Sequence, residues 1–354
     1  MRAAVLWDVD DLRIVELDLD PPRTGEVAIR MAASGVCRSD SHAVHGVHRH
    51  AMPIVLGHEG SAVVEEVGEG VTGVKPGDHV VCSWLPYCGS CRRCTSGRPV
   101  VCERLGVFDA GFLADGTTRF SHGKTRIHHN VPSSFAERSV VPANTVFPVD
   151  ASLPLEQVAL LGCAVMTGVG AVLNTSKVRP GDSVLVIGCG GVGLSAIQGA
   201  RIAGASPIVA VDVVQSKLEL AEELGATETV LAGRDRIPQG FDHAIECLGR
   251  TETIEQAMSA VAPGGTAVLV GMAAPGARAP LDALRTTTKE LTVVGSWYGS
   301  LVPPRDLPML AHLLGFGELR LEPMIARTIP LDGIHDALAR FETGDEARSV
   351  IVYD

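Results

Sequence analysis

Four closely spaced cysteines are the residues of this 354-residue chain whose types and spacing point most directly to chemistry. They follow the pattern C-x2-C-x2-C-x7-C and are Cys88, Cys91, Cys94 and Cys102. Four thiolates at this spacing can surround one Zn²⁺ tetrahedrally and leave no position for a substrate. Disulfide bonds are the alternative. The tight spacing of the cluster disfavours them, as does the absence of a secretory pattern near the N-terminus. We therefore expect a structural zinc in a lobe at about residues 84–104.

A glycine-rich motif is a second candidate site, for a ligand that carries phosphates. Residues 188–193 fit the pattern G-x-G-x-x-G, between the apolar run 183–187 and a helical pattern. Backbone N–H groups and the start of that helix would face a pyrophosphate. The motif residues are Gly188, Gly190, Gly191, Val192 and Gly193.

Two charged residues follow this motif. Asp212 stands nineteen residues after Gly193, at the end of an apolar run. Its carboxylate can accept hydrogen bonds from an adenosine ribose and would repel a 2′-phosphate, which favours NAD over NADP. Lys217 also suits a ribose contact, although it can equally be a solvated helix lysine. A glycine-rich turn with a solvated aspartate is the simpler alternative, and the order of strand, turn, helix, strand and acid argues against it.

A third set of candidate ligands is dispersed along the chain. Cys37 lies in the run GVCRSDSH, His58 in GHEG and Cys163 in LGC. Two thiolates and one imidazole leave the fourth tetrahedral position of a zinc ion open for water or substrate. Spacing alone does not choose Cys163 over Cys189.

From Cys37 to Arg348, nearly the whole chain, the sequence resembles the zinc-dependent alcohol dehydrogenases of the medium-chain dehydrogenase/reductase superfamily. The resemblance implies that Cys37, His58 and Cys163 bind a catalytic zinc, with Glu59 beside it as a transient ligand. It also implies two zinc ions per chain, NAD as cofactor, and hydride transfer between an alcohol and an aldehyde.

The same resemblance assigns residues that move protons. Asp40 matches the position that hydrogen-bonds the zinc-ligating histidine and fixes its tautomer. Ser39 would take the hydroxyl proton of the substrate and pass it through the nicotinamide ribose to His42 and solvent. The alternative for Ser39 is a hydroxyl that caps a turn.

Further positions are assigned to the cofactor and the substrate. Arg38 and Arg348 match positions that hold the pyrophosphate, whereas without the family both would be solvated surface arginines. Thr167 matches a position near the nicotinamide, and Val270 is a further cofactor contact. Trp84 aligns with the substrate cleft, where an indole would favour primary alcohols, although a tryptophan can also belong to the core.

Four histidines at His42, His45, His48 and His50 resemble a metal-binding tract. We interpret three of them as surface residues near the mouth of the pocket, with His42 as the exception. The better candidates for substrate selection are residues 105–130 and the segment Ser-Trp-Tyr-Gly at 296–299.

Composition excludes several classes of partner. With 30 basic and 41 acidic residues the formal charge is −11, which argues against nucleic acid. We expect no membrane span, since the nearest apolar stretch is the glycine-rich segment after Ser183, which we interpret as strand, turn and helix. A cytoplasmic protein that acts on a small molecule is the expectation.

The elements that must position these residues divide into two kinds. Residues 1–164 show short β-type runs between turn residues, which predict a β-rich catalytic domain, GroES-like by the resemblance. Residues 165–300 alternate six β-type runs with helices, which predicts a doubly wound parallel Rossmann sheet. Residues 301–354 end in a β-type run that would return to the first domain. The fold class is therefore α/β.

Alternative functions stay open at this point. The runs at 163–170 and 296–299 look like those of actinobacterial formaldehyde dehydrogenases that act on a thiol adduct. A nicotinoprotein with resident NAD(H) is a second variant, and a non-catalytic zinc-stabilised binding protein is a different class. The family implies a homodimer or homotetramer, in which edge strands near residue 295 would pair.

Overall fold

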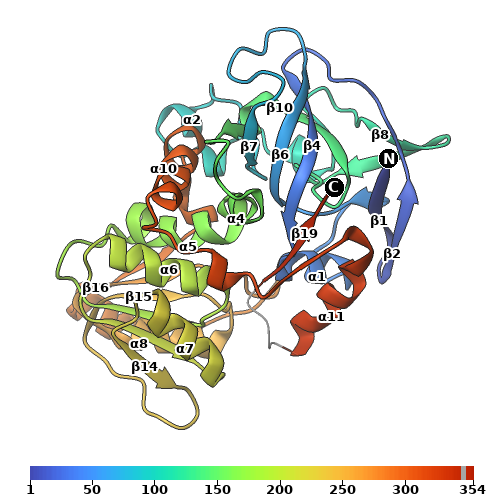
Figure 1. Ribbon diagram of the computed structural model, residues 1–354. Coiled ribbons are helices and arrows are strands. Elements are labelled where there is room, and N and C mark those ends of the chain that lie inside the picture. The colour runs from blue at the N-terminus through green and yellow to red at the C-terminus, as the bar shows by residue number, and fades with distance from the viewer. Residues whose placement is uncertain (344–347) are drawn as a thin grey trace. The chain divides into compact units, whose positions relative to one another are not determined.

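The computed structural model describes residues 1–343 and 348–354, which form two compact units. The first unit comprises Met1–Cys163 and Val302–Asp354, and the second comprises Ala164–Leu301. The boundaries expected from the sequence, 164/165 and 300/301, each differ by one residue from the boundaries of these units, 163/164 and 301/302. Figure 1 shows the chain returning at its C-terminus to a sheet of the first unit.

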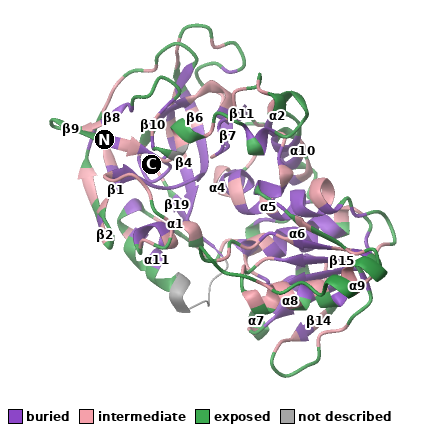
Figure 2. Cartoon of the chain, turned by 180° about the vertical axis from the view of Figure 1, so that it is seen from behind, coloured by how far each residue is buried: buried purple, intermediate pink, exposed green. Residues whose placement is uncertain are grey.

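The larger sheet of the first unit has the strand order β11-β7-β6-β4-β19-β18, and β10 also pairs with β4. Its central strand β4 directs Val27, Ile29 and Met31 into a hydrophobic core, and Figure 2 shows β4 largely buried. The predicted return of the last run is confirmed, because β19 pairs antiparallel with β4. The strands are β4 Glu26–Gly35, β6 Glu59–Val67, β7 His79–Cys82, β10 Arg138–Pro142, β11 Val146–Pro148, β18 Arg327–Ile329 and β19 Ser349–Val352.

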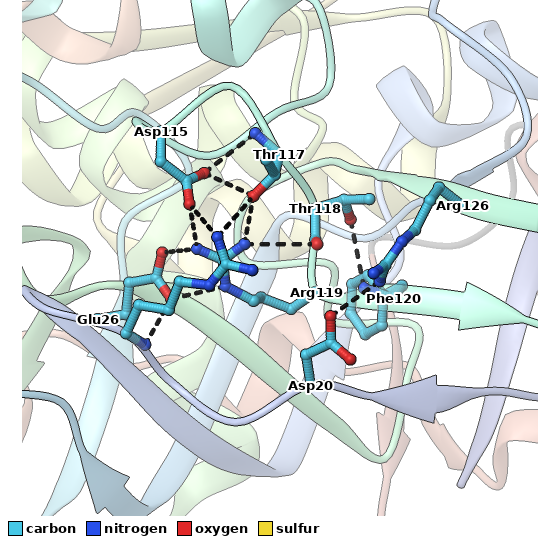
Figure 3. A network of polar contacts seen from close by, with 9 residues as sticks. Asp20, Glu26, Asp115, Thr117, Thr118, Arg119, Phe120 and Arg126 are labelled. Carbon is cyan, nitrogen blue, oxygen red and sulfur yellow. Dashed lines mark hydrogen bonds and ion pairs between the residues drawn. The ribbon is translucent and has the colours of Figure 1, made fainter.

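A second sheet of the first unit has the order β2-β1-β5-β9-β8-β3. The strands are β1 Arg2–Asp8, β2 Asp11–Glu16, β3 Asp18–Leu19, β5 Ile54–Val55, β8 Phe120–His122 and β9 Thr125–His129. A buried ion-pair network ties this region to β4: Arg119 donates to Glu26 Oε2 at 2.8 Å and to Asp115 Oδ2 at 2.7 Å (Figure 3). Because Arg119 is fully buried, these carboxylates neutralise a charge that water cannot reach.

The helices of the first unit are short except at its C-terminal part. They are α1 Arg38–Val44, α2 Arg92–Thr95, η1 Pro99–Val101, α3 Gly106–Asp109, η2 Ala143–Thr145, α4 Leu155–Leu160, α10 Pro303–Gly315, η6 Glu322–Met324, η7 Leu331–Gly333 and α11 Ile334–Thr343. The first turn of α10 begins with Pro303 and Pro304. Proline is accepted there because the first N–H groups of a helix have no intrahelical partner.

The second unit is built on a six-stranded parallel sheet of order β14-β13-β12-β15-β16-β17, so the predicted doubly wound sheet is confirmed. Its strands are β12 Val184–Ile187, β13 Ile208–Asp212, β14 Glu228–Leu231, β15 Phe241–Glu246, β16 Val261–Leu269 and β17 Thr292–Gly295. Its helices are α5 Met166–Gly170, α6 Gly191–Ile202, α7 Gln215–Leu224, α8 Thr251–Ala260, α9 Ala283–Thr288 and η5 Tyr298–Ser300. Strand order reverses between β12 and β15, which is where such sheets bind ligands at their carboxyl ends.

One helical segment corrects the expectation that the stretch after Ser183 comes nearest to a membrane span. Among the described residues, Leu155–Ser176 is long and apolar enough to cross a membrane, with a mean hydropathy of 1.8 in its most apolar window. The sequence had pointed to the stretch after Ser183 instead. Of that window, 72% is buried inside the structure, as in a core helix. The segment contains two π-helical stretches, η3 Leu161–Val165 and η4 Ala171–Ser176.

Candidate metal centre and dinucleotide site

Three separate elements bring four potential ligands together in the first unit. The ligand atoms of Cys37, His58, Glu59 and Cys163 all lie within 4.8 Å of one another. Cys37 is the N-cap of α1, Glu59 begins β6, and His58 directly precedes it. Cys163 lies in the π-helical stretch η3. A π-helical turn shifts a side chain off the α-helical repeat and is frequent at functional sites.

The imidazole of His58 is oriented by the carboxylate of Asp40. Its Nδ1 lies 3.0 Å from Oδ1 of Asp40, whose other oxygen accepts the backbone N–H of Cys37 at 3.0 Å. A proton on Nδ1, donated to Asp40, leaves Nε2 as the free ligand atom. Burial opposes the imidazolium, but the buried carboxylate of Asp40 outweighs it and raises the pKa of His58 well above its usual value.

A buried carboxylate and a buried guanidinium flank this set. Arg348 donates from Nη2 to Oε1 of Glu59 at 3.0 Å and to Sγ of Cys37 at 3.6 Å. Burial raises the pKa of Glu59 to about 7, although Arg348 opposes the shift. A Cβ at Gly35 would meet Oε2 of Glu59 at 2.1 Å, so only glycine leaves room for this carboxylate.

The donor set fits a zinc ion. The hydrogen bond from Cys163 is the main reason that the pKa of Cys37 is lowered, and Arg348 and His58 add to it. One thiolate is thus favoured even before a cation binds, and a cation would favour the second. Two sulfurs and one imidazole nitrogen, with a carboxylate close by, are the ligands of an open zinc site.

The four-cysteine cluster converges as a second group whose ligand atoms lie within 4.8 Å of one another. Sγ–Sγ distances are 3.9 Å for Cys88–Cys94, 3.5 Å for Cys91–Cys94 and 3.9 Å for Cys91–Cys102. Sulfurs about 2.3 Å from one zinc ion would lie about 3.8 Å apart in a tetrahedron. Backbone N–H groups of Cys91, Cys88 and Arg104 also point at cluster sulfurs. None of the nine cysteines forms a disulfide.

In the second unit, the glycine motif forms the turn between β12 and α6. Gly188 has a φ of 95°, and a Cβ at Gly193 would meet the carbonyl oxygen of Gly188 at 1.7 Å, so both positions need glycine. Asp212 ends β13 and is 8% exposed. Its Oδ2 accepts the N–H of Cys189 at 2.7 Å, and its Oδ1 accepts the N–H of Val214 at 3.0 Å. Asp212 therefore fixes the turn, and each oxygen keeps a lone pair for a ligand.

Glu246, which sequence reasoning missed, organises the neighbouring strand ends. Its carbonyl accepts the N–H groups of Val270 and Gly271 at 2.9 and 3.0 Å. Its Oε1 accepts those of Leu248 and Gly249, both at 2.8 Å, and its Oε2 has no partner in the part of the chain that is described. An acid at the carboxyl end of a β-type run was the available signal.

The comparisons with known proteins agree over the whole length of the chain. A model described as alcohol dehydrogenase GroES-like domain matches residues 23–151, and one described as zinc-binding dehydrogenase matches residues 191–314. S-(hydroxymethyl)glutathione dehydrogenase of Escherichia coli O6:H1 is 39% identical over 367 residues, 99% of each chain. The chain belongs to the zinc-dependent alcohol dehydrogenase family.

Solved structures support the family and its cofactors. Benzyl alcohol dehydrogenase from Acinetobacter calcoaceticus has a TM-score of 0.94 and 31% identity, over 100% of this chain and 99% of that chain. A Sinorhizobium meliloti 1021 protein solved with NADP has a TM-score of 0.84 and 27% identity, over 99% of each chain. This alcohol dehydrogenase family member thus combines zinc-binding domains with a fold that takes a nicotinamide dinucleotide.

The remaining predicted residues of this dehydrogenase occupy three kinds of position. Ser39 is half-buried, with Oγ 3.1 Å from Nε2 of His58, and the ring of Trp84 lies edge-on to His58 at 6.4 Å. Within the first unit, Arg38 is exposed and His42 half-buried on α1. In the second unit, Thr167, Lys217 and Val270 lie on α5, on α7 and directly after β16.

Proposed function

We propose that this protein is an NAD-dependent alcohol dehydrogenase that reversibly oxidises a primary alcohol to an aldehyde by hydride transfer. The observation that carries the proposal is the convergence of Cys37, His58 and Cys163, two sulfurs and one nitrogen, with the carboxylate of Glu59 close by. Zinc supplies Lewis acidity toward a substrate oxygen there, and NAD supplies the hydride acceptor.

The chain's own residues have distinct roles in this proposal. Cys37, His58 and Cys163 hold the catalytic zinc, and Asp40 keeps the coordinating nitrogen of His58 free. Glu59 is poised as a transient ligand, because a carboxylate whose pKa is about 7 is balanced between its two protonation states near neutral pH. Cys88, Cys91, Cys94 and Cys102 hold a second, structural zinc.

The proton of the substrate hydroxyl leaves along α1. Ser39 accepts it at Oγ, which is half-buried and already oriented toward Nε2 of His58 and Sγ of Cys37. His42, one turn further along the same helix, would take up the proton and release it to solvent, and the ribose of a bound nicotinamide dinucleotide would link it to Ser39.

Each unit, taken by itself, offers candidate contacts for a dinucleotide. The glycine turn and the start of α6 suit a pyrophosphate, and the carboxylate of Asp212 disfavours a 2′-phosphate. In the second unit we also assign cofactor contacts to Lys217, Val270 and Thr167. In the first unit we assign the pyrophosphate contact to Arg38 and to Arg348, whose Nε has no partner in the described part of the chain.

A thiol-adduct formaldehyde dehydrogenase is the second candidate, favoured by the 39% identity to an S-(hydroxymethyl)glutathione dehydrogenase. The narrow pocket implied by Trp84 beside His58 is compatible with either substrate. A screen of primary and secondary alcohols, aldehydes and formaldehyde separates them, run with NAD or NADP and with or without a low-molecular-weight thiol. Turnover of primary alcohols with NAD and no thiol supports the main proposal, and formaldehyde turnover only with thiol supports the alternative.

Two further measurements exclude the other classes. Metal analysis should give two zinc ions per chain, whereas one zinc without alcohol oxidation would favour a non-catalytic binding protein. Exhaustive dialysis should remove activity until NAD is added back. Activity with an artificial electron acceptor that survives dialysis would instead identify a nicotinoprotein.

We propose that the protein forms a homo-oligomer whose interface is the sheet edge of the second unit. Among the described strands β17 is the last in its sheet, and an edge strand can pair with another copy. Beside it a cavity of about 360 Å³ is lined in part by Met258, Leu281 and Leu291. Light scattering should give a dimer or tetramer, and Val293→Pro should weaken this association.

A further inference from the structure

The chain that follows α1 folds back on the end of that helix. His42 lies in the last turn of α1, and its carbonyl accepts the N–H of Val47 at 2.8 Å and that of His48 at 3.3 Å. The imidazole of His48 consequently lies against that of His42, with ring centroids 5.4 Å apart and an interplanar angle of 61°. The geometry pairs two imidazoles rather than dispersing them over the surface.

The other histidine of this loop turns elsewhere. His45 is exposed, and its Nδ1 lies 2.6 Å from Oδ1 of Asp10. His48, by contrast, is half-buried, and its Nε2 is buried with no hydrogen-bond partner in the described part of the chain. A buried ring nitrogen without a hydrogen-bond partner costs free energy. Hydration of its own ring therefore does not explain why His48 takes this position.

Two imidazoles in partly desolvated contact do not take up two protons independently. Once one ring is an imidazolium, the second is protonated less readily, because like charges repel more strongly where water is scarce. Burial lowers the pKa of His42, and His48 lowers it next, followed by Arg38 and, least, His45. Cys37 is the acidic group among the strongest influences on His42, and it opposes the shift.

We propose that His48 is a positioning residue for His42, which holds the imidazole at the end of α1 and keeps it neutral, ready to accept the substrate proton. The inference rests on the proton relay of the proposed function and adds a residue to it. A neutral His42 can take the proton on a ring nitrogen and release it to solvent, whereas an imidazolium cannot accept one.

The test compares His48→Phe with the wild type in the zinc-loaded, full-length enzyme. Phenylalanine keeps a ring against His42 and removes the titratable nitrogens. NMR of histidine-labelled protein follows His42 directly, with its signal assigned by loss in His42→Gln. The midpoint of the His42 titration should rise by on the order of half a pH unit. The acid limb of the pH profile of kcat/KM should move in the same direction, so that activity at pH 6 falls about threefold.

Two variants control for structural effects. His45→Gln removes the neighbouring histidine that faces Asp10, and it should shift the His42 midpoint less than His48→Phe does. His48→Asn removes both the ring and the charge, and it should raise the His42 midpoint as well. Circular dichroism and zinc content should match the wild type in each case.

The outcomes separate this inference from the relay itself. If His42→Gln loses activity while His48→Phe leaves both the NMR midpoint and the acid limb in place, the role of His48 is overturned and the relay stands. If His42→Gln keeps full activity with an unchanged pH profile, the relay is wrong, and with it the catalytic role of His48. A raised midpoint together with a shifted acid limb supports the inference.

Discussion

The two cysteine centres of the first unit differ in how they are assembled and in what surrounds them. Cys88, Cys91, Cys94 and Cys102 come from one short stretch, and backbone N–H groups point at their sulfurs. Cys37, His58 and Cys163 come from three separate elements, and ionisable side chains enclose them. A local set of four thiolates closes the coordination of a zinc ion, whereas a dispersed set of three leaves a position that the fold can adjust.

The ionisable neighbours are what distinguish the open centre. Asp40, Glu59 and Arg348 are each no more than 5% exposed there, and each touches a candidate ligand or its neighbour. Burying three charges costs free energy that folding must offset, so their presence is evidence of chemistry at the site rather than of stability. The closed centre has no carboxylate or imidazole among its ligands.

The largest expected effect follows from breaking the open centre. His58→Ala removes the imidazole ligand and leaves Asp40 without its partner, so turnover should fall by several orders of magnitude. The melting temperature should fall as well, because the carboxylate of Asp40 stays buried without its partner, but the four-cysteine centre should keep its zinc. Alcohol oxidation rates, zinc content and calorimetry check this. A variant that retains more than a tenth of its turnover would contradict the assignment of the catalytic metal.

The complementary change breaks the closed centre. Cys91→Ser should lose the structural zinc and lower the melting temperature by on the order of 10 °C, since metal binding there contributes to folding. The remaining folded fraction should keep its KM for alcohol, because no ligand of the open centre changes. Thermal unfolding and kinetics on the soluble fraction test both parts. Wild-type stability with lost activity would reverse the roles assigned to the two centres.

The contrast also explains how much of the molecule the sequence could predict. The closed centre follows from the spacing of four residues, and the parallel sheet follows from alternating β-type and helical runs. The open centre needed the family resemblance, because Cys163 and Cys189 are equivalent by spacing. Cys163 is selected by the π-helical stretch η3, which no periodicity predicts, while Cys189 binds Asp212 through its backbone N–H.

Long-range pairs account for what sequence reasoning could not place. Arg348 would be a surface arginine by residue type, yet strand β19 returns beside β4 and buries it against Glu59. Glu246 ends strand β15, and only the strand order shows it at the reversal of the sheet. Both depend on contacts between residues far apart in the chain, which local patterns do not encode.

A smaller effect is expected from the proton path of the open centre. Ser39→Ala removes the hydroxyl that lies 3.1 Å from Nε2 of His58 without removing a metal ligand. Turnover should fall by roughly 10² to 10⁴-fold, the usual contribution of a positioned proton acceptor. Two zinc ions per chain should remain. Ser41→Ala, on the buried side of the same helix, is the matched control, and equal losses in both variants would point to a defect of the helix.

The smallest expected effect uses two buried histidines of the first unit. His58 has the carboxylate of Asp40 beside it, whereas His129 stacks on Phe120 and bonds to the hydroxyl of Ser133. Burial lowers the pKa of His129 to about 3, opposite in direction to the shift of His58. The difference lies in the partner, since both rings are buried and only one faces an acid.

The lowered pKa of His129 makes folding stability depend on pH. Between about pH 6.5 and 3 the unfolded chain binds a proton that the folded chain does not, so the free energy of unfolding falls as the pH falls. The slope from this group is at most about 1.4 kcal/mol per pH unit. His129→Asn should flatten the fall between pH 6 and 4 in denaturant titrations, relative to the wild type. The same change at exposed His122 should leave the slope unaltered, and parallel curves for His129→Asn would mean that this ring is protonated when folded.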